Sequence, residues 1–296
     1  MTILQAIILG IVQGLTEFIP ISSTAHLVFA SRLVGLFDGV DATLKAEQTT
    51  ATIAVIQLGT LLAVLIYFAR DILNITRAFI VDHIALITRK TANGDGRFGL
   101  SQNAWLGWLV IIGSIPVAVV GLLLKKQIEG TFTKNLWVIA TMMILVAIFL
   151  AIAEWVGKRN KSMNELGVGD ALAVGFAQVL ALIPGSSRSG STIMGGLFSG
   201  LTRETAARFS FLLSIPAIAA SGLLELKEAI HKLPEGTAVP LVVATIISGV
   251  VGYASIWFLL RFLRTHSTGI FIVYRLVVGA AIIFALAGGY ITAAVS

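Results

Sequence analysis

The chain has 296 residues, of which 57% are hydrophobic and only 12% are charged, and its mean hydropathy is +0.94. Soluble proteins carry about 25% charged residues, so the composition excludes a soluble globular protein and indicates an all-α integral membrane protein. The apolar runs are continuous and do not alternate with period two, which excludes a membrane β-barrel. The net charge of +6 comes from basic residues scattered among short loops, so it indicates contact with membrane lipids and no nucleic-acid partner.

Six apolar segments are long enough for a transmembrane helix, which needs about 20 residues. They are 52–69, 105–124, 136–155, 209–225, 239–260 and 270–292. Two further apolar regions, 2–36 and 168–201, are each interrupted in the middle by polar residues, Pro and Gly. We predict that each forms a re-entrant hairpin of two half-helices, because irregular backbone at membrane depth must be buried in protein or line a wet cavity. The longest polar stretch, 71–103, is predicted as a loop, with a surface helix left open.

The two interrupted regions resemble each other. Residues 10–13 align with 175–178, and after a one-residue gap 20–24 align with 184–188. Each hairpin is followed by three predicted spans, so the single membrane domain 1–296 divides into repeats 1–160 and 165–296. Because three spans are an odd number, the second repeat enters the membrane from the opposite side. This predicts an inverted-topology repeat with both hairpin tips near the midplane.

Lys and Arg residues predict the orientation of the chain, because cytoplasmic loops carry more of them. Twelve lie on one side of the predicted spans: Arg70, Arg77, Arg89, Lys90, Arg97, Lys158, Arg159, Lys161, Arg203, Arg208, Arg261 and Arg264. Seven lie on the other side: Arg32, Lys45, Lys125, Lys126, Lys134, Lys227 and Lys232. The first side is therefore predicted to be cytoplasmic, with the first hairpin opening to the outside.

The break in the second hairpin is a polar segment, Pro184-Gly185-Ser186-Ser187-Arg188-Ser189-Gly190. Pro and Gly interrupt the helix, while the serines and the arginine offer hydroxyls, backbone N–H groups and one fixed positive charge. This combination suits a phosphate group. We predict that Gly185, Ser186, Ser187, Arg188 and Ser189 bind a diphosphate. The alternative is that Arg188 extends to the membrane interface as an ordinary amphipathic side chain.

The break in the first hairpin carries an acidic group inside apolar sequence. Glu17 must be paired, hydrated or metal-bound at that depth, and Gln13 lies four residues earlier on the same helical face. The functional interpretation makes Glu17 a general base or a metal ligand. The alternative is a carboxylate bonded to the backbone of its own hairpin.

Hydroxyl groups and a histidine follow in the same hairpin. Ser22, Ser23 and Thr24 are candidates for capping the second half-helix. Ser22 and Thr24, together with Gln13, are predicted to bind the diphosphate. Ser23 aligns with Ser187 in the repeat and is the favoured nucleophile. His26 lies one helical turn further and shares a face with Ser23, so it would deprotonate Ser23, protonate the leaving group or itself attack phosphorus. The residues leave Ser23 and His26 both open as the nucleophile.

Three segments carry a resemblance to a known family. They are Gln13-Gly14-Leu15-Thr16-Glu17-Phe18, Pro20-Ile21-Ser22-Ser23-Thr24-Ala25-His26 and the segment 184–190. Together they resemble the undecaprenyl-diphosphate phosphatase family, also called the bacitracin-resistance protein family. The similarity extends along nearly the whole chain.

The resemblance implies a hydrolase that converts undecaprenyl diphosphate to undecaprenyl phosphate and phosphate. It implies a multi-pass enzyme of the bacterial cytoplasmic membrane whose site opens to the periplasm. Such an enzyme recycles the lipid carrier of peptidoglycan synthesis and confers resistance to bacitracin, which binds the substrate. By position, its functional residues are Glu17, Ser23, His26, Ser187 and Arg188. The resemblance also allows a homodimer.

The resemblance further implies a divalent cation, Mg²⁺ or Ca²⁺. The family has Glu or Gln at the position of Gln13, so this chain lacks a second carboxylate there. Glu17 is then the candidate protein ligand, together with substrate oxygens.

A lipid-phosphate transporter is the alternative function. Inverted repeats with broken helices are typical of transporters, and a flippase would need the same anion site. The asymmetry of the two hairpins favours an enzyme, because Glu17 and His26 have no counterparts in the second repeat.

Overall fold

The computed structural model describes residues 1–88, 99–124, 135–233 and 236–293, and only the backbone of 42–43, 221 and 223–232. The described residues form helices and no β-strand, which confirms the all-α prediction. Six basic residues used to predict the orientation lie outside the described residues: Arg89, Lys90, Arg97, Lys125, Lys126 and Lys134.

Both interrupted regions form a pair of helices joined at the predicted break. The first pair is α1 (Ile3–Phe18) and α2 (Ser23–Leu33). The second is α8 (Val168–Val179), extended by the 3₁₀ turn η4 (Leu180–Leu182), and α9 (Arg188–Phe198). The residues before the two prolines, Ile19 and Ile183, have extended backbone with ψ of 135° and 120°. A proline disfavours helical conformation in the residue before it, so Pro20 and Pro184 account for both breaks.

Five helices are long and apolar enough to cross a membrane in the part of the chain that the structure describes. They are α3 (Ala42–Tyr67), α5 (Gln102–Leu123), α7 (Leu136–Val156), α11 (Ala238–Leu263) and α12 (Gly269–Ala287). They coincide with five of the six predicted spans. The sixth, 209–225, lies within α10 (Arg203–Lys232), which is not among the five. It stays a prediction, as does the inverted arrangement of the repeats.

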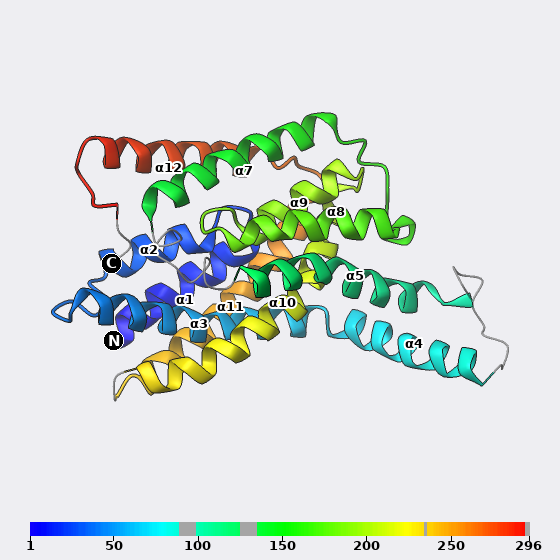
Figure 1. Ribbon diagram of the computed structural model, residues 1–296, viewed down its shortest axis with the longest axis horizontal. Coiled ribbons are helices and arrows are strands. Elements are labelled where there is room, and N and C mark those ends of the chain that lie inside the picture. Colours follow the sequence, from blue (N-terminus) through cyan, green and yellow to red (C-terminus); the bar gives the residue numbers. More distant parts are fainter. Residues whose placement is uncertain (89–98, 125–134, 234–235, 294–296) are drawn as a thin grey trace.

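Part of the predicted loop 71–103 is a helix, α4 (Ala69–Ile87). It follows α3 after a break at Phe68 and leans away from the bundle (Figure 1). Phe79 of α4 packs on α5, where a Cβ added to Gly107 would lie 2.9 Å from the Phe79 ring. Polar and apolar residues alternate along α4 with helical period, so this segment is a helix with one face against protein.

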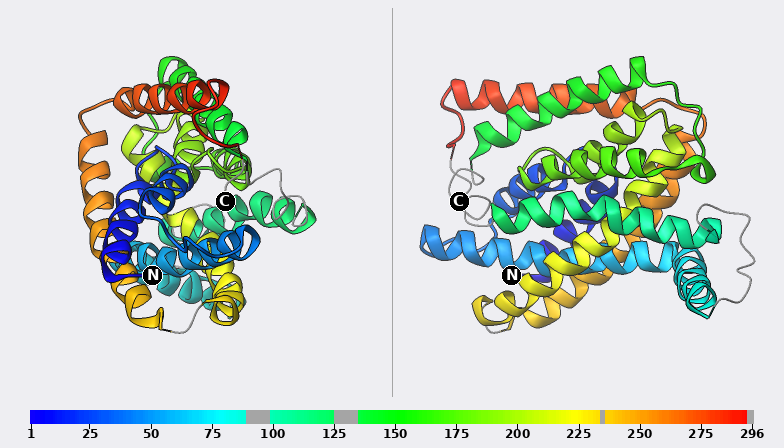
Figure 2. Two further views of the ribbon diagram at one scale, coloured as in Figure 1. Left: turned by 90° about the vertical axis from the view of Figure 1, so that its left-hand side faces the viewer. Right: turned by 45° about the vertical axis from the view of Figure 1, so that its right-hand side comes forward.

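The two hairpins lie in the middle of the molecule, and the longer helices surround them (Figures 1 and 2). Glycines bring each hairpin close to a neighbouring helix. A Cβ at Gly10 in α1 would lie 2.6 Å from the carbonyl oxygen of Ala244 in α11. A Cβ at Gly175 in α8 would lie 2.3 Å from the carbonyl oxygen of Gly113 in α5. Gly10 and Gly175 therefore both permit a close helix–helix contact, which supports their alignment.

The starts of the paired helices lie at one spacing. Ile3 and Val168 begin the first helices, and Ser23 and Arg188 begin the second helices, so 165 positions separate each pair. Ile19 and Ile183, before the prolines, are 164 positions apart, so the predicted one-residue gap is present at the prolines and closes at the N-caps. Ser22 corresponds to Ser187, since both are N-caps with positive φ, 77° and 68°. Ser23 thus corresponds to Arg188, and its proposed match with Ser187 no longer supports it as the nucleophile.

Candidate active site

The two hairpin tips contact each other through an ion pair. Nη2 of Arg188 lies 2.6 Å from Oε1 of Glu17, and the Ser189 hydroxyl donates to the carbonyl oxygen of Ile19 at 3.3 Å. Glu17 is the second-last residue of α1, and Arg188 is the first residue of α9. The structure therefore brings together the acid of the first hairpin and the guanidinium of the second.

This ion pair is deeply placed and hydrogen-bonded. The side chain of Glu17 is 6% exposed and that of Arg188 is 16% exposed. Two amides also donate to the carboxylate, Nε2 of Gln13 at 3.1 Å and Nε2 of Gln57, from α3, at 3.3 Å. Buried charges need such pairing and donors to offset desolvation. Two alternatives were left open by the sequence: an Arg188 side chain that extends to the membrane interface, and a Glu17 carboxylate bonded to the backbone of its own hairpin. Neither holds, because Arg188 is paired with Glu17 and the carboxylate of Glu17 bonds to side chains.

Arg275 of α12 forms hydrogen bonds with both hairpin tips. Its side chain is fully buried, and it donates to the carbonyl oxygens of Pro20, Gly185 and Ser186 at 3.4, 3.0 and 3.0 Å. Two further bonds go to the carbonyl oxygens of Met142 and Met143 in α7. Five carbonyl oxygens therefore solvate the guanidinium of Arg275 in place of a carboxylate.

The helices α2 and α9 both begin at this junction. Helix N-termini carry unsatisfied N–H groups and a partial positive charge, which favour a bound anion. The Ser187 hydroxyl caps α9 by accepting from the N–H of Gly190 at 3.1 Å. Ser22 is the N-cap of α2 but makes no side-chain cap bond, and its buried hydroxyl has no partner in the described part of the chain. Together with Arg188, the two helix ends form a positively polarised junction.

His26 is engaged by groups other than Ser23. Its Nδ1 lies 2.7 Å from the carbonyl oxygen of Ser22, and its Nε2 lies 2.6 Å from the hydroxyl of Tyr274. A carbonyl oxygen only accepts, so Nδ1 carries the proton, and in the neutral ring Nε2 accepts from Tyr274. Ser23 is half-buried, and its side chain makes no hydrogen bond among the described residues. The expected His26–Ser23 contact is therefore not present.

The remaining hydroxyls differ in availability. Ser186 donates to the carbonyl oxygen of Ile183 at 2.7 Å, and Ser189 bonds the first tip. Thr24 is exposed at the start of α2. Of the predicted diphosphate-binding residues, Gly185, Ser187 and Ser189 lie at the junction beside Arg188, and Ser186 holds the loop closed.

The residues of the junction provide only some of the oxygen ligands that a bound cation needs. No cluster of three or more His, Cys, Asp or Glu side chains occurs in the ranges that the structure describes. Glu17 is accompanied by Oε1 of Gln13, which is buried and has no partner there. Mg²⁺ is commonly bound by one or two carboxylates together with substrate phosphates. These residues thus fit a cation held jointly with substrate, and not a preformed protein cage.

Several residues of the site were not assigned a role from the sequence. Gln57 and Thr60 of α3 contact the Glu17–Gln13 pair, with Thr60 3.4 Å from Nε2 of Gln13. Tyr274 and Arg275 come from α12. The signal for all four was a polar side chain within an apolar span, but its partners were not visible in the sequence.

Fold and junction define an all-α integral membrane protein with an ion pair buried between two helical hairpins. The model of the family described as bacitracin resistance protein BacA matches residues 6–281. The chain belongs to this bacitracin resistance protein family.

Curated relatives match the chain over almost its full length. An undecaprenyl-diphosphatase of Syntrophobacter fumaroxidans is 52% identical over 96% of this chain and 97% of the relative. An undecaprenyl-diphosphatase of Chloroherpeton thalassium is 48% identical over 99% and 100%. One of Mycobacterium ulcerans is 48% identical over 98% of each chain. These names give no support to the alternative of a transporter.

Proposed function

We propose that the protein hydrolyses undecaprenyl diphosphate to undecaprenyl phosphate and inorganic phosphate. The observation that carries this proposal is the Glu17–Arg188 pair, at 2.6 Å, where two helix N-termini meet. Full-length relatives named undecaprenyl-diphosphatase support it. The reaction regenerates the lipid carrier of peptidoglycan synthesis, and it confers bacitracin resistance because bacitracin binds the diphosphate form.

Arg188 is the group that binds the diphosphate. A guanidinium has five N–H donors in a planar fork, and only Nη2 is hydrogen-bonded to Glu17. The other nitrogens make no hydrogen bond among the described residues, so they are available for phosphate oxygens. The N–H groups at the start of α2 and α9 add donors that strengthen as charge develops on the transferring phosphoryl group.

Ser23 is the nucleophile that the contacts favour. Its hydroxyl is not hydrogen-bonded within the described residues, while both ring nitrogens of His26 are occupied. The Ser23 oxygen forms a bond to the terminal phosphorus, and the bond from that phosphorus to the bridging oxygen breaks. Undecaprenyl phosphate leaves with that electron pair. Water then attacks the phosphoserine, releasing inorganic phosphate and restoring the hydroxyl.

Glu17 is the base for this step. A phosphate that binds Arg188 takes the place of the Glu17 carboxylate beside it. The freed carboxylate accepts the Ser23 proton. His26, fixed by Ser22 and Tyr274, then orients the first turn of α2.

A divalent cation, Mg²⁺ or Ca²⁺, completes the proposed site. Glu17 and Oε1 of Gln13 would hold it together with substrate oxygens, and it would neutralise charge on the diphosphate. A chelator should stop phosphate release and added Mg²⁺ or Ca²⁺ should restore it. Unchanged turnover after chelation and dialysis would remove the cation from the proposal.

The proposed setting is the bacterial cytoplasmic membrane, with the site opening to the periplasm. The excess of Lys and Arg on the opposite side of the predicted spans supports this orientation. A homodimer is a further proposal, which light scattering of the purified protein would test.

The test is phosphate release from undecaprenyl diphosphate by the purified protein, compared with Ser23→Ala, His26→Ala and Glu17→Ala. We expect turnover by the parent and none by Ser23→Ala. Labelled terminal phosphate, followed by acid quenching, should give phosphoserine at position 23. A labelled His26, or a parent that is folded but inactive with Mg²⁺ and Ca²⁺ present, would overturn the assignment or the function respectively.

A further inference from the structure

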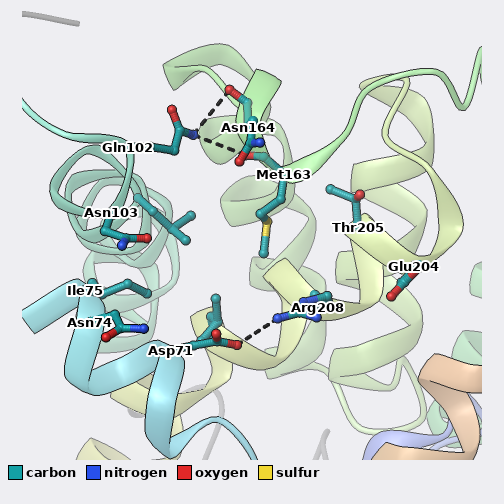
Figure 3. Close-up of a pocket in the computed structure, with 12 residues that line it drawn as sticks. Asp71, Asn74, Ile75, Gln102, Asn103, Met163, Asn164, Glu204, Thr205 and Arg208 are labelled. Carbon is teal, nitrogen blue, oxygen red and sulfur yellow. Dashed lines mark hydrogen bonds and ion pairs between the residues drawn. The ribbon is translucent and has the colours of Figure 1, made fainter. Parts of the chain in front are cut away.

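A second polar cavity lies away from the hairpin junction (Figure 3). Its volume is about 380 Å³. Helices α4, α5 and α10 and the 3₁₀ turn η3 (Met163–Glu165) line it. None of its lining residues belongs to the candidate active site. It includes Arg208, one of the residues predicted to be cytoplasmic, in the second turn of α10.

The cavity contains charges of both signs. Nη2 of Arg208 lies 2.8 Å from Oδ2 of Asp71, and Figure 3 shows this pair joining α10 to α4. Glu204 lines another part and bonds to Arg264, which is outside the cavity. The side chains of Arg208 and Asp71 are 35% and 38% exposed. Ion pairs with this exposure contribute only about 0–1 kcal/mol, so a ligand can separate the two charges at little cost.

The arrangement matches a zwitterion better than an anion. The cavity presents one pair of opposite charges, Arg208 and Asp71, because the carboxylate of Glu204 is already paired with Arg264. The amides of Asn74, from α4, and Asn103, from α5, add donors and acceptors. A phosphate group would bond to Arg208, and a primary ammonium would donate to Asp71. A diphosphate would take Arg208 and leave Asp71 without a cation.

An apolar groove continues from the polar cavity. It has a volume of about 260 Å³ and is lined by α4, α5 and α10, and Ile75 and Leu212 line both spaces. Along α5 the cavity is lined as far as Leu106 and the groove as far as Ile111. Along α10 the corresponding residues are Leu212 and Pro216. At a rise of 1.5 Å per residue, the groove extends about 6–8 Å beyond the cavity along these helices.

We propose that the cavity and groove together bind one phospholipid with a zwitterionic, primary-amine headgroup, phosphatidylethanolamine. The phosphate bonds to Arg208, the ammonium donates to Asp71, and one acyl chain enters the groove. Phosphatidylglycerol lacks the cation. Phosphatidylcholine has the cation but no N–H donor, so its headgroup leaves the carboxylate oxygens without hydrogen bonds.

Lipid retention by the purified protein tests the headgroup contacts. The delipidated protein is mixed with equal amounts of phosphatidylethanolamine, phosphatidylglycerol and phosphatidylcholine, and bound lipid is counted by native mass spectrometry. We expect one molecule of phosphatidylethanolamine to be retained by the parent. Arg208→Gln should lower this retention about tenfold, the effect of one lost charge-assisted contact, and Asp71→Asn should reduce the preference over phosphatidylcholine.

The matched control is Arg261→Gln, since Arg261 is a guanidinium near the same end that packs on Trp257 outside the cavity. It should retain lipid as the parent does. Equal retention of the three lipids by the parent, or the same loss in Arg208→Gln and Arg261→Gln, would overturn the proposal. Phosphate release by each variant confirms that it is folded.

A second pair of variants tests the groove. Ile111→Trp places a large side chain in the groove, whereas Ile115→Trp places it one turn further along an exposed part of α5 outside the groove. Ile111→Trp should lose lipid retention and Ile115→Trp should keep it. If both variants retain lipid equally, the acyl chain does not occupy this groove and the assignment is wrong.

Discussion

Two arginines inside the molecule have hydrogen-bond partners of different kinds. Arg188 faces the carboxylate of Glu17, whereas Arg275 faces only backbone carbonyl oxygens. A carboxylate can be exchanged for a phosphate, but five carbonyl oxygens from three segments form a fixed cradle. We therefore assign binding to Arg188 and positioning to Arg275.

Arg188→Lys should lose most activity. An ammonium keeps the charge but has no planar fork for two phosphate oxygens, and the loss should be about 100-fold in kcat/KM, or about 2.7 kcal/mol. The measurement is phosphate release at several substrate concentrations. Near-normal turnover in this variant would remove Arg188 from its proposed role.

Arg275→Met should destabilise the protein and separate the tips. Truncation leaves buried carbonyl oxygens of Pro20, Gly185 and Ser186 without a donor, at about 1–3 kcal/mol for each group. We expect a clearly lower melting temperature in detergent and a fall in kcat.

The control for Arg275 is Arg261→Met, at an exposed position beside Trp257, which should melt as the parent does. A positioning role also predicts that Arg275→Lys recovers part of kcat, because a lysine reaches some of the same oxygens. If Arg275→Met melts and turns over normally, the tips do not depend on this side chain.

The residues of the junction were only partly predictable from sequence. Glu17 and Arg188 were identified because a charge in an apolar hairpin requires a partner, and the structure pairs them. The partners of His26 were not predictable, since Tyr274 comes from the last helix and no local spacing relates the two.

At the scale of elements, the tip of the second hairpin presses against helix α7. Gly185 has φ of +93°, and a Cβ there would lie 2.2 Å from the carbonyl oxygen of Ile139. Its own carbonyl oxygen accepts from Arg275 at 3.0 Å. The glycine thus permits both the turn and the close approach that place Arg188.

Gly185→Ala should lower the melting temperature and the activity together. Gly39→Ala is a matched control, because Gly39 has φ of +87° with no atom within 4 Å of an added Cβ. Both variants carry the cost of a positive φ, so their difference isolates the contact with Ile139, about 1–3 kcal/mol for an overpacked site. Equal melting temperatures for the two variants would show that the tip has room to move.

Element boundaries were predictable wherever a single residue type enforces them. Pro20 and Pro184 place both hairpin breaks, and the continuous apolar runs place five long helices. Whether the segment of α4 forms a helix was left open, because its many polar residues indicate a loop. Its helical periodicity is recognised only once α4 is seen to pack against α5. The predicted alignment gap holds at the prolines but ends before the helix starts, since at the N-caps Ser22 corresponds to Ser187.

At the scale of the whole molecule, the proposed orientation is open to direct measurement. The chain has no cysteine, so a single introduced cysteine is an unambiguous reporter. Leu33→Cys, at a position 87% exposed at the end of α2, should react with an impermeant maleimide added outside intact cells. Arg264→Cys should react only after the membrane is opened, and the reverse pattern would invert the proposed topology.

The spacing of 165 positions between the helix starts has a consequence for ancestry. Each half supplies one tip, and neither tip alone holds the paired charges: Glu17 comes from one half and Arg188 from the other. A protein consisting of one half would form such a junction only where two copies met, with identical tips. Fusion of two such copies into one chain would remove that equality and leave one tip free to acquire the carboxylate and imidazole and the other the guanidinium.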